Sequence, residues 1–438
     1  MARLSVIGAG YLGVTHAVCM AHLGHEVIVI DTNADRIAQL ANGVVPFHEP
    51  ELAELLEQAL SRGSITFTTE WADIAAAADV HFLCVGTPQQ CNSHAADMSQ
   101  VFAAVTSICE NVSSPALIVG KSTVPVGTAE TIAATLHSTF GDSVTLVWNP
   151  EFLREGFAVH DTLQPDRIVL GVRRNDDVET LKQIYAAALS DGTPLLVTDY
   201  ATAELVKVAA NAFLATKISF INAFADLADA TGADITQLAD AIGHDTRIGR
   251  RFLNAGVGFG GGCLPKDIRA LQARATELGL AEQFAFLTAV DEINKSRKHT
   301  VVQRTLEALD GSLEHKVVAI LGAAFKPDSD DIRDSPALHV AEMLADNGAR
   351  VQVHDPEAIR VLRERNTNLA LCDSIDEALA GADVVLHLTE WAVYREIDPV
   401  AAAQLTRSAI IIDGRNVLDR DRWTNAGWSI SYLGKPGS

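Results

Sequence analysis

The 438-residue sequence is poor in basic residues, and this limits what it can bind. It contains 34 lysines and arginines against 56 aspartates and glutamates, a formal net charge of −22. Such a surface repels nucleic acid and anionic lipid, so we expect no nucleic acid and no membrane as a partner. An anionic ligand would need locally placed cations or helix N-termini.

Paired cysteines and long apolar runs are also missing. The six cysteines show no C-x-x-C spacing, so we expect free thiols, no metal site and a reducing, cytoplasmic setting. No apolar run reaches the ~18 residues of a membrane span. Because a glycine motif begins at Gly8, we expect no signal peptide. The length suggests two or three domains.

The first 31 residues have the pattern of a dinucleotide site. An apolar strand at 4–7 precedes Gly8–Gly13, a helix follows, and a second strand at 26–30 ends at Asp31. In this motif Gly8 permits a tight turn, Gly10 lets a pyrophosphate approach, and Gly13 allows helix–strand packing. Asp31 can bond ribose hydroxyls and repels a 2′-phosphate, which favours NAD over NADP.

Several polar residues near this motif follow predicted strands. Arg36 is placed to reach the adenosine end of the cofactor, or is an exposed helix residue. Thr87 and Pro88 follow a strand at 78–85, and Thr123 follows one at 116–119. In a doubly wound sheet such loops line the ligand crevice, although ordinary turn chemistry is the alternative.

A further strand at 144–147 leads into a loop with two carboxylates, Glu151 and Glu155. A general base could work there, whereas each acid alone would be an ordinary surface group. A helix predicted over 202–231 contains no glycine or proline and is too polar to span a membrane. Its Lys207 and Asn211 share one face, and a lysine on that apolar face needs an anionic partner.

The stretch Gly256–Asp267 combines five glycines with a cysteine, a lysine and an aspartate. Pro265 indicates a helix start, with the helix running to about Leu278. Cys263 would stand at the N-terminus of that helix, where the dipole favours a thiolate. Cys263 is therefore a candidate nucleophile, and an inert buried thiol in a tight loop is the alternative. We expect the glycines to clear space for a ligand. A loop with three arginines at 246–254 indicates anion binding, or a solvated charge cluster.

From Lys316 the pattern of the first domain recurs, without G-x-G-x-x-G. Strands are expected at 317–322, 349–355, 382–389 and 409–416, and Lys326, Arg333 and Arg415 fall at strand ends. The sequence therefore predicts an α/β fold of two Rossmann-like, doubly wound domains joined by a long central helix. We predict an NAD-binding domain over 1–200, a central helical domain over 201–300, and a ligand-binding domain over 301–438.

In combination, these motifs resemble the UDP-glucose/GDP-mannose dehydrogenase family over nearly the whole chain, most closely the members that act on UDP-glucose. The resemblance is carried by segments in a fixed order: Gly8–Gly13, Val85–Pro88, Lys121–Thr128, Asn149–Gly156, Pro165–Gly171, Glu204–Asn211, Gly256–Asp267, Phe325–Arg333 and Asp413–Asn416. The family oxidises a primary alcohol to a carboxylate with two NAD.

The resemblance implies a role for each matching residue. Cys263 matches the nucleophile, which would form a thiohemiacetal and then a thioester. The residues matching the catalytic set around it are Lys207, Asn211, Asp267, Thr123 and Glu151, and whether Lys207 or a water held by Asp267 takes the hydroxyl proton stays open. The cofactor set is Gly8, Gly10, Tyr11, Leu12, Gly13, Asp31, Arg36, Thr87, Pro88, Thr123, Glu155 and Arg333.

The residues matching the substrate set, for a UDP-sugar, are Glu151, Phe152, Leu153, Lys207, Asn211, Arg247, Phe252, Asn254, Gly260, Phe325, Lys326 and Arg415. Arg247 would reach across from a second subunit of a homodimer built on the central helical domain. The implied product is UDP-glucuronate for polysaccharide biosynthesis. Two departures from the family are Gly262, where a serine is usual, and residues 89–96.

Other interpretations remain at this stage. The same chemistry could act on GDP-mannose or a UDP-N-acetylhexosamine. A two-electron β-hydroxyacid dehydrogenase would lack the nucleophilic cysteine and the second Rossmann unit. A non-catalytic nucleotide-sugar sensor would lack Cys263, Lys207 or Asp267, and all three are present.

Overall fold

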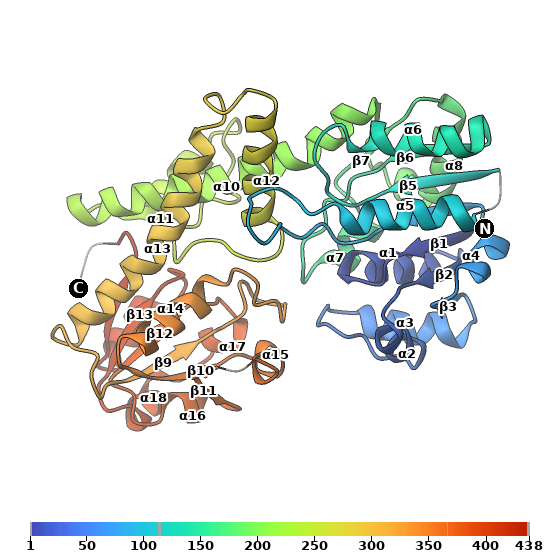
Figure 1. Cartoon of the computed structure of the whole chain (residues 1–438). Helices are drawn as coiled ribbons and strands as arrows, with labels where there is room; N and C mark the ends of the chain where they lie inside the picture. The colour runs from blue at the N-terminus through green and yellow to red at the C-terminus, as the bar shows by residue number, and fades with distance from the viewer. Residues whose placement is uncertain (1, 113–114, 366, 436–438) are drawn as a thin grey trace. The chain divides into compact units, whose positions relative to one another are not determined.

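The computed structural model describes residues 2–112, 115–365 and 367–435 and forms two compact units (Figure 1). The first comprises Met1–Ala210 and Arg269–Gly279, and the second Asn211–Ile268 and Leu280–Ser438. Two helices, α10 (Tyr200–Thr231) and α12 (Leu264–Glu277), contribute to both units. The predicted division into three domains at residues 200 and 300 stays a prediction. Residues 1, 113–114, 366 and 436–438, which belong to the first and third predicted domains, lie outside the described residues.

Unit 1 contains an eight-stranded sheet in the order β3-β2-β1-β4-β5-β6-β7-β8. Its strands are β1 (Arg3–Ile7), β2 (Glu26–Ile30), β3 (Ile65–Thr68), β4 (Val80–Leu83), β5 (Ala116–Gly120), β6 (Val144–Trp148), β7 (Ile168–Gly171) and β8 (Leu195–Thr198). All pairs are parallel except β6 with β7. The first six strands have the 3-2-1-4-5-6 order of a dinucleotide-binding fold.

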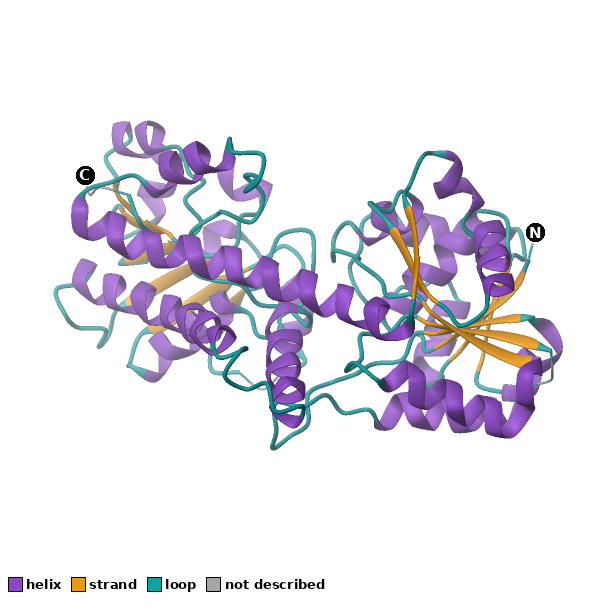
Figure 2. Cartoon of the chain, turned by 90° about the horizontal axis from the view of Figure 1, so that it is seen from above, coloured by secondary structure: helices purple, strands orange, loops and turns teal. Residues whose placement is uncertain are grey.

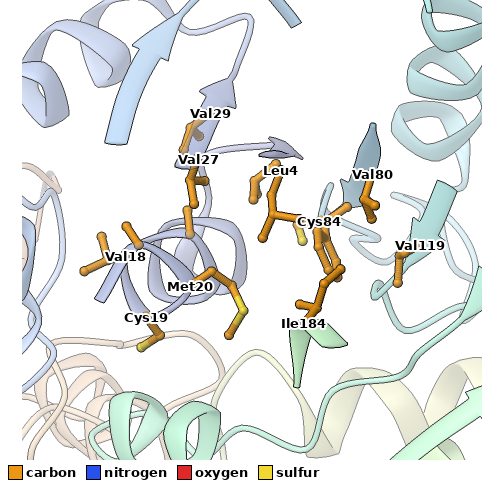
Figure 3. Packing of buried hydrophobic residues seen from close by; sticks show 14 of the residues in the cluster. Leu4, Val18, Cys19, Met20, Val27, Val29, Val80, Cys84, Val119 and Ile184 are labelled. Carbon is orange, nitrogen blue, oxygen red and sulfur yellow. The ribbon is translucent and has the colours of Figure 1, made fainter. Parts of the chain in front are cut away.

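Helices cover both faces of this sheet because each buried strand alternates its apolar side chains between two cores. Leu4 and Val6 of β1 point into one core, and Ile7 points into the other. Figure 3 shows the first core, where side chains of β1, β2, β4 and β5 meet those of α1. The helices are α1 (Tyr11–His22), α2 (Ala34–Ala41), α3 (Leu52–Ser61), α4 (Trp71–Ala77), α5 (Ser99–Asn111), α6 (Thr128–Phe140), α7 (Ala158–Leu163), α8 (Asn175–Ile184) and α9 (Ala186–Ser190), with a 3₁₀ turn η1 at Gly141–Ser143.

Unit 2 contains a parallel six-stranded sheet in the order β11-β10-β9-β12-β13-β14, which is again 3-2-1-4-5-6. Its strands are β9 (Val317–Leu321), β10 (Arg350–His354), β11 (Ala370–Cys372), β12 (Val384–His387), β13 (Ile410–Asp413) and β14 (Ser429–Tyr432). Figure 2 shows helices on both sides of the strands of each unit. Besides parts of α10 and α12, the helices of unit 2 are α11 (Ile235–Gly243), α13 (Phe286–Ala308), α14 (Pro336–Asp346), α15 (Ala358–Arg363), α16 (Ile375–Leu379), α17 (Ala392–Arg395), α18 (Pro399–Leu405) and α19 (Arg420–Asn425).

The predicted α/β class, with two Rossmann-like units and a long helix, is confirmed. Three short strands, β8, β11 and β14, were not predicted. Each has only three or four residues and lies at a sheet edge, so its hydrophobic pattern is short and incomplete.

The long helix α10 differs from its prediction in one respect. Among the described helices, it alone is long and apolar enough to cross a membrane by length and composition. The expectation that it is too polar was therefore wrong. Its small and branched side chains are also used within the protein, because Ala203, Ala215, Ile221 and Ala225 are fully buried. A core helix has the same composition.

One buried carboxylate joins α10 to α6. The side chain of Glu204 accepts hydrogen bonds from the backbone N–H groups of Gly127, at 2.7 Å, and Ala129, at 2.6 Å. These donors belong to the first turn of α6, where backbone N–H groups have no partner within the helix. Glu204 therefore fixes the loop that leads from β5 into α6.

We predict that Glu204→Ala lowers the free energy of unfolding by about 1–3 kcal/mol, because two buried N–H groups lose their acceptor. Chemical denaturation monitored by circular dichroism measures this. Glu57→Ala, which removes an exposed carboxylate of α3, is the matched control and should change stability by less than about 0.5 kcal/mol. Equal effects of the two substitutions would contradict the assigned role.

Candidate active site

The glycine motif after β1 has the geometry that a dinucleotide requires. Gly8 has φ +103°, and a Cβ built on Gly13 would lie 1.8 Å from the carbonyl oxygen of Gly8, so α1 packs directly on the turn. A Cβ built on Gly10 has no atom within 4 Å, so the backbone there is open to a pyrophosphate. Tyr11 and Leu12 follow as the first residues of α1.

Asp31, at the end of β2, is held beside this turn. Its carboxylate accepts the N–H of Ala9 at 2.7 Å and that of Asn33 at 2.9 Å. The guanidinium of Arg36 lies 3.5 Å from it. Carboxylate oxygens have more than one acceptor position each, so Asp31 can still bond a ribose. The residues of this edge fit NAD.

The neighbouring loops after β4 and β5 are tied together. The hydroxyl of Thr87 donates to the carbonyl oxygen of Thr123 at 2.8 Å, and that of Ser122 donates to the carbonyl oxygen of Val85 at 2.7 Å. Pro88 continues the first loop. The structure thus brings the predicted Thr87 and Thr123 side by side at the carboxyl edge of the sheet.

Glu49 connects this edge to the loop after β6, and sequence-based prediction missed it. Its carboxylate accepts the hydroxyl of Tyr11 and the N–H groups of Gly156 and Ala158, the latter two at 2.7 Å. Burial and the bond to Glu49 raise the pKa of Tyr11, with a smaller contribution from nearby Glu155. A lone acid that is 38 to 109 residues from its partners leaves no motif in the sequence.

Glu151 and Lys207 form a buried ion pair, with 2.9 Å between the carboxylate and the ammonium. This supplies the anionic partner that the lysine was expected to need. The second oxygen of Glu151 accepts the N–H of Leu153 at 2.5 Å, which fixes the carboxylate. The ring of Phe152 lies beside two cations, Arg167 at 3.8 Å and Lys207 at 5.7 Å.

A second polar cluster surrounds the start of α12. Cys263 immediately precedes this helix and is half-buried. Asp267 donates its N–H to the carbonyl of Cys263 at 2.9 Å, as in a first helical turn. The buried carboxylate of Asp267 accepts the amide of Asn211 at 2.6 Å and pairs with Lys266 at 2.8 Å. Among the described residues, no group of three metal-ligating side chains is found.

The glycines before Cys263 accommodate the protein's own chain, whereas we expected them to clear space for a ligand. A Cβ on Gly260 would lie 2.3 Å from the carbonyl oxygen of Asp334, and one on Gly261 would lie 2.7 Å from the ring of Phe325. A Cβ on Gly262 would lie 2.3 Å from the guanidinium carbon of Arg333. The guanidinium of Arg333 therefore occupies the space that a serine side chain at position 262 would need.

Three buried side chains from α10 and α13 hold the glycine stretch, and none was predicted. The side-chain amide of Asn294 bonds both the N–H of Phe259, at 2.8 Å, and its carbonyl, at 2.9 Å. Asn222 accepts the N–H of Gly256 at 2.9 Å, and Arg297 donates to its carbonyl at 3.2 Å. Each donor or acceptor satisfies a buried backbone group that would otherwise be unpaired.

The remaining predicted substrate residues lie in unit 2. Arg415 donates to the carbonyls of Leu388, Gly258 and Phe325 at 2.7–3.3 Å, so it joins the glycine stretch to the second sheet. Lys326 lies 5.5 Å from the ring of Phe325, and Arg333 pairs with Asp331. The others lie on the arginine loop: Arg247 is 87% exposed and pairs with Asp245, Phe252 has φ 65°, and Asn254 accepts from Arg250.

The second sheet has an aspartate at the position that corresponds to Asp31 of the first sheet, but its surroundings differ. Asp355, after β10, accepts the N–H groups of Ala323 and Ala324 at 2.7 and 2.9 Å, as Asp31 accepts that of Ala9. It is only 2% exposed, and the indole of Trp391 also donates to it, at 3.2 Å. This acid is therefore closed to a ribose, in agreement with the missing glycine motif.

A buried lysine follows β5 in unit 1. The ammonium of Lys121 donates to the side-chain oxygen of Asn149 at 3.0 Å and to the hydroxyl of Tyr185 at 3.3 Å. Burial lowers the pKa of Lys121 to about 8, against smaller opposing effects of Cys84 and Glu151. Sequence-based prediction assigned a role to Thr123, two residues further on, but none to Lys121.

This pKa predicts a pH dependence of stability. The unfolded chain keeps the lysine proton up to the ordinary pKa of 10.5, whereas the folded chain releases it above about 8. The unfolded state therefore binds more protons in this window, and stability should rise with pH. Relative to Lys121→Met, the wild-type free energy of unfolding should increase by roughly 3 kcal/mol between these pH values. Urea unfolding at several pH values measures it, and a constant difference would contradict it. The exposed Lys182→Met is the control.

Comparisons with known proteins agree with this geometry. Models of the UDP-glucose/GDP-mannose dehydrogenase family match at residues 2–189 for the NAD-binding domain, 201–296 for the central domain and 319–420 for the UDP-binding domain. The UDP-glucose 6-dehydrogenase of Rhizobium meliloti is 38% identical over 99% of this chain and 100% of its own.

Two solved structures are similar throughout. A UDP-glucose dehydrogenase of Pyrobaculum islandicum has a TM-score of 0.89 and 38% identity, covering 100% of this chain and 98% of its own. The UDP-D-ManNAc dehydrogenase of Pyrococcus horikoshii has a TM-score of 0.86 and 26% identity, covering 99% of each chain. The chain belongs to the UDP-glucose/GDP-mannose dehydrogenase family of NAD-dependent oxidoreductases.

Proposed function

We propose that this protein oxidises the C6 alcohol of UDP-glucose to the carboxylate of UDP-glucuronate. The observation that carries the proposal is the half-buried thiol of Cys263 directly before α12, backed by the Asp267–Asn211 pair. A thiol in this position supplies a nucleophile at a helix N-terminus. The 38% identity to proteins named for UDP-glucose supports this sugar over the UDP-D-ManNAc of the 26% identical relative.

When bound at the glycine motif, NAD would accept a hydride from C6 in each of two oxidations. The residues proposed to hold it are those of the motif, Asp31 and Arg36, the loops of Thr87 and Thr123, Glu155 and Arg333. In the first oxidation, Lys207 or a water held by Asp267 takes the proton of the C6 hydroxyl as the aldehyde forms.

Cys263 then adds to the aldehyde and forms a thiohemiacetal, which the second oxidation converts to a thioester. Donors from Lys207 and Asn211 stabilise the oxyanion. Glu151, with Thr123, directs a water at the thioester carbonyl and takes its proton, and the C–S bond breaks to release the acid. The covalent bond keeps the aldehyde in place between the two oxidations.

We further propose that the nucleotide sugar is held by Phe152, Leu153, Phe252, Asn254, Gly260, Phe325, Lys326 and Arg415. Because the guanidinium of Arg415 already bonds three carbonyls, its part is to position the glycine stretch as much as to bind directly. GDP-mannose and UDP-N-acetylhexosamines are the alternative substrates. The setting we propose is cytoplasmic, in polysaccharide precursor synthesis.

A homodimer is the proposed assembly. Phe213, Phe220 and Leu227 of α10 are spaced by seven residues and stay 65%, 46% and 55% exposed. Residues seven apart lie on nearly the same side of a helix, so they form an apolar stripe suited to a second copy. Arg247, exposed on the loop after α11, would extend to the site of the partner.

Substitution of the thiol tests the chemistry. With UDP-glucose, the wild type should form two NADH per sugar, and Cys263→Ser should form the acid at least ~100-fold more slowly. Cys91→Ser, at an exposed cysteine, is the control and should match the wild type. The assay is repeated with GDP-mannose and UDP-N-acetylglucosamine. Normal acid formation by Cys263→Ser would exclude the covalent route, and a faster rate with another sugar would change the substrate.

Charge on the apolar stripe tests the assembly. In sedimentation, the wild type should have twice the mass of one chain, and the double variant Phe213→Glu and Phe220→Glu should have the mass of one, because charges destabilise an apolar interface. Phe102→Glu on α5, 42% exposed, is the control. A wild type that sediments as one chain would contradict the dimer.

A further inference from the structure

Lys121 is hydrogen-bonded to the segment that carries Glu151. Asn149, two residues before Glu151, has its side-chain oxygen bonded by the ammonium of Lys121 at 3.0 Å and by the hydroxyl of Tyr185 at 2.6 Å. The amide nitrogen of Asn149 donates to the carbonyl of Val169 at 2.9 Å. Asn149 is therefore fixed on both sides. In the described part of the chain, no carboxylate forms an ion pair with Lys121, which is 7% exposed.

A cavity of about 60 Å³ joins Lys121 to Glu151. Both residues line it, together with His16, Asn149 and Tyr185. This volume has room for ordered water, and the walls offer several polar partners. The Nε2 atom of His16 is buried without a protein partner among the described residues. A water in the cavity would satisfy it, and the same water can bridge to the lysine.

Lys207 pairs with Glu151 at 2.9 Å but is not among the residues that line the cavity. The other ionisable groups around the cavity are paired, neutral or exposed. Asp161, on α7, is paired with Arg154 at 2.6 Å, and Arg167 stacks on Phe152. Burial keeps the pKa of His16 well below its ordinary value and raises those of Cys84 and Tyr185, so all three are neutral near pH 8. Asp166, the remaining ionisable residue of the lining, is exposed.

We propose that Lys121 is the proton-exchange partner of Glu151 through water in this cavity. The inference rests on the proposed hydrolysis of the thioester. As the water oxygen bonds to the carbonyl carbon, its proton moves to the carboxylate of Glu151, and the thiolate of Cys263 leaves. The proton then passes from the carboxyl of Glu151 through cavity water to the neutral amine of Lys121. The resulting ammonium later releases it to solvent, so no proton or electron is unaccounted for.

This exchange needs the neutral amine. The neutral fraction increases as the pH rises through the pKa of Lys121, about 8, so thioester hydrolysis should accelerate with pH and level off above it. A permanently charged side chain in the same place cannot accept a proton. Lys121→Arg keeps the positive charge and the donors and removes the acceptor at every accessible pH.

The test compares the pH profile of acid formation with that of NADH formation in a single turnover with UDP-glucose, using the full chain. The wild type should show a rise in hydrolysis rate with a midpoint near pH 8. Lys121→Arg should keep the NADH burst of the wild type, lose the rise, and hydrolyse at least ~10-fold more slowly at pH 9. Lys182→Arg, at an exposed lysine, should match the wild type.

A milder variant guards against a folding defect in Lys121→Arg. Tyr185→Phe removes one acceptor of the ammonium, so the pKa of Lys121 falls and the midpoint should move to lower pH. Profiles of Lys121→Arg and Tyr185→Phe that superimpose on the wild type would overturn the inference. Failure of the proposed function itself is distinct, because the wild type would then give no thioester and no second NADH.

Discussion

The structure depends on how closely other chain segments approach the glycine stretch that ends at Cys263. A side chain at any of Gly260, Gly261 or Gly262 would collide with the carbonyl of Asp334, the ring of Phe325 or the guanidinium of Arg333. The loop before the thiol is therefore held by close contacts within its own unit, and the bonds of Asn294 and Arg297 to its backbone add to this support. In the proposed role of nucleophile, a thiol held in this way would need little reorganisation to react.

Buried charge is the second organising feature. The Glu151–Lys207 and Asp267–Lys266 pairs, and the lone cation Lys121, are all costly to bury unless their partners are in place. Each is anchored to backbone or amide groups within its own unit. Such arrangements of pairs and neighbours are typical of sites where proton affinity is tuned for chemistry.

The sequence predicted what is periodic or local. The two doubly wound sheets follow from strand–helix alternation, and the shared face of Lys207 and Asn211 from their spacing by four residues. What could not be predicted was long-range pairing between single residues. Glu49, Asn294, Arg297 and Lys121 each meet partners far along the chain, and no spacing rule connects them. The prediction of open space beside the glycines was wrong for a related reason. A glycine indicates that another group comes close to the backbone, but the sequence does not show whether this group belongs to a ligand or to the protein itself.

The two sheets differ in one acid. Asp31 and Asp355 hold the same turn in the same way, but Trp391 covers the second one. In the second sheet the acid therefore serves its bond to the turn, independently of any cofactor. An engineer who restored the missing glycines after β9 would thus still not obtain a second NAD site. The indole would also have to be removed, and with it part of that unit's core.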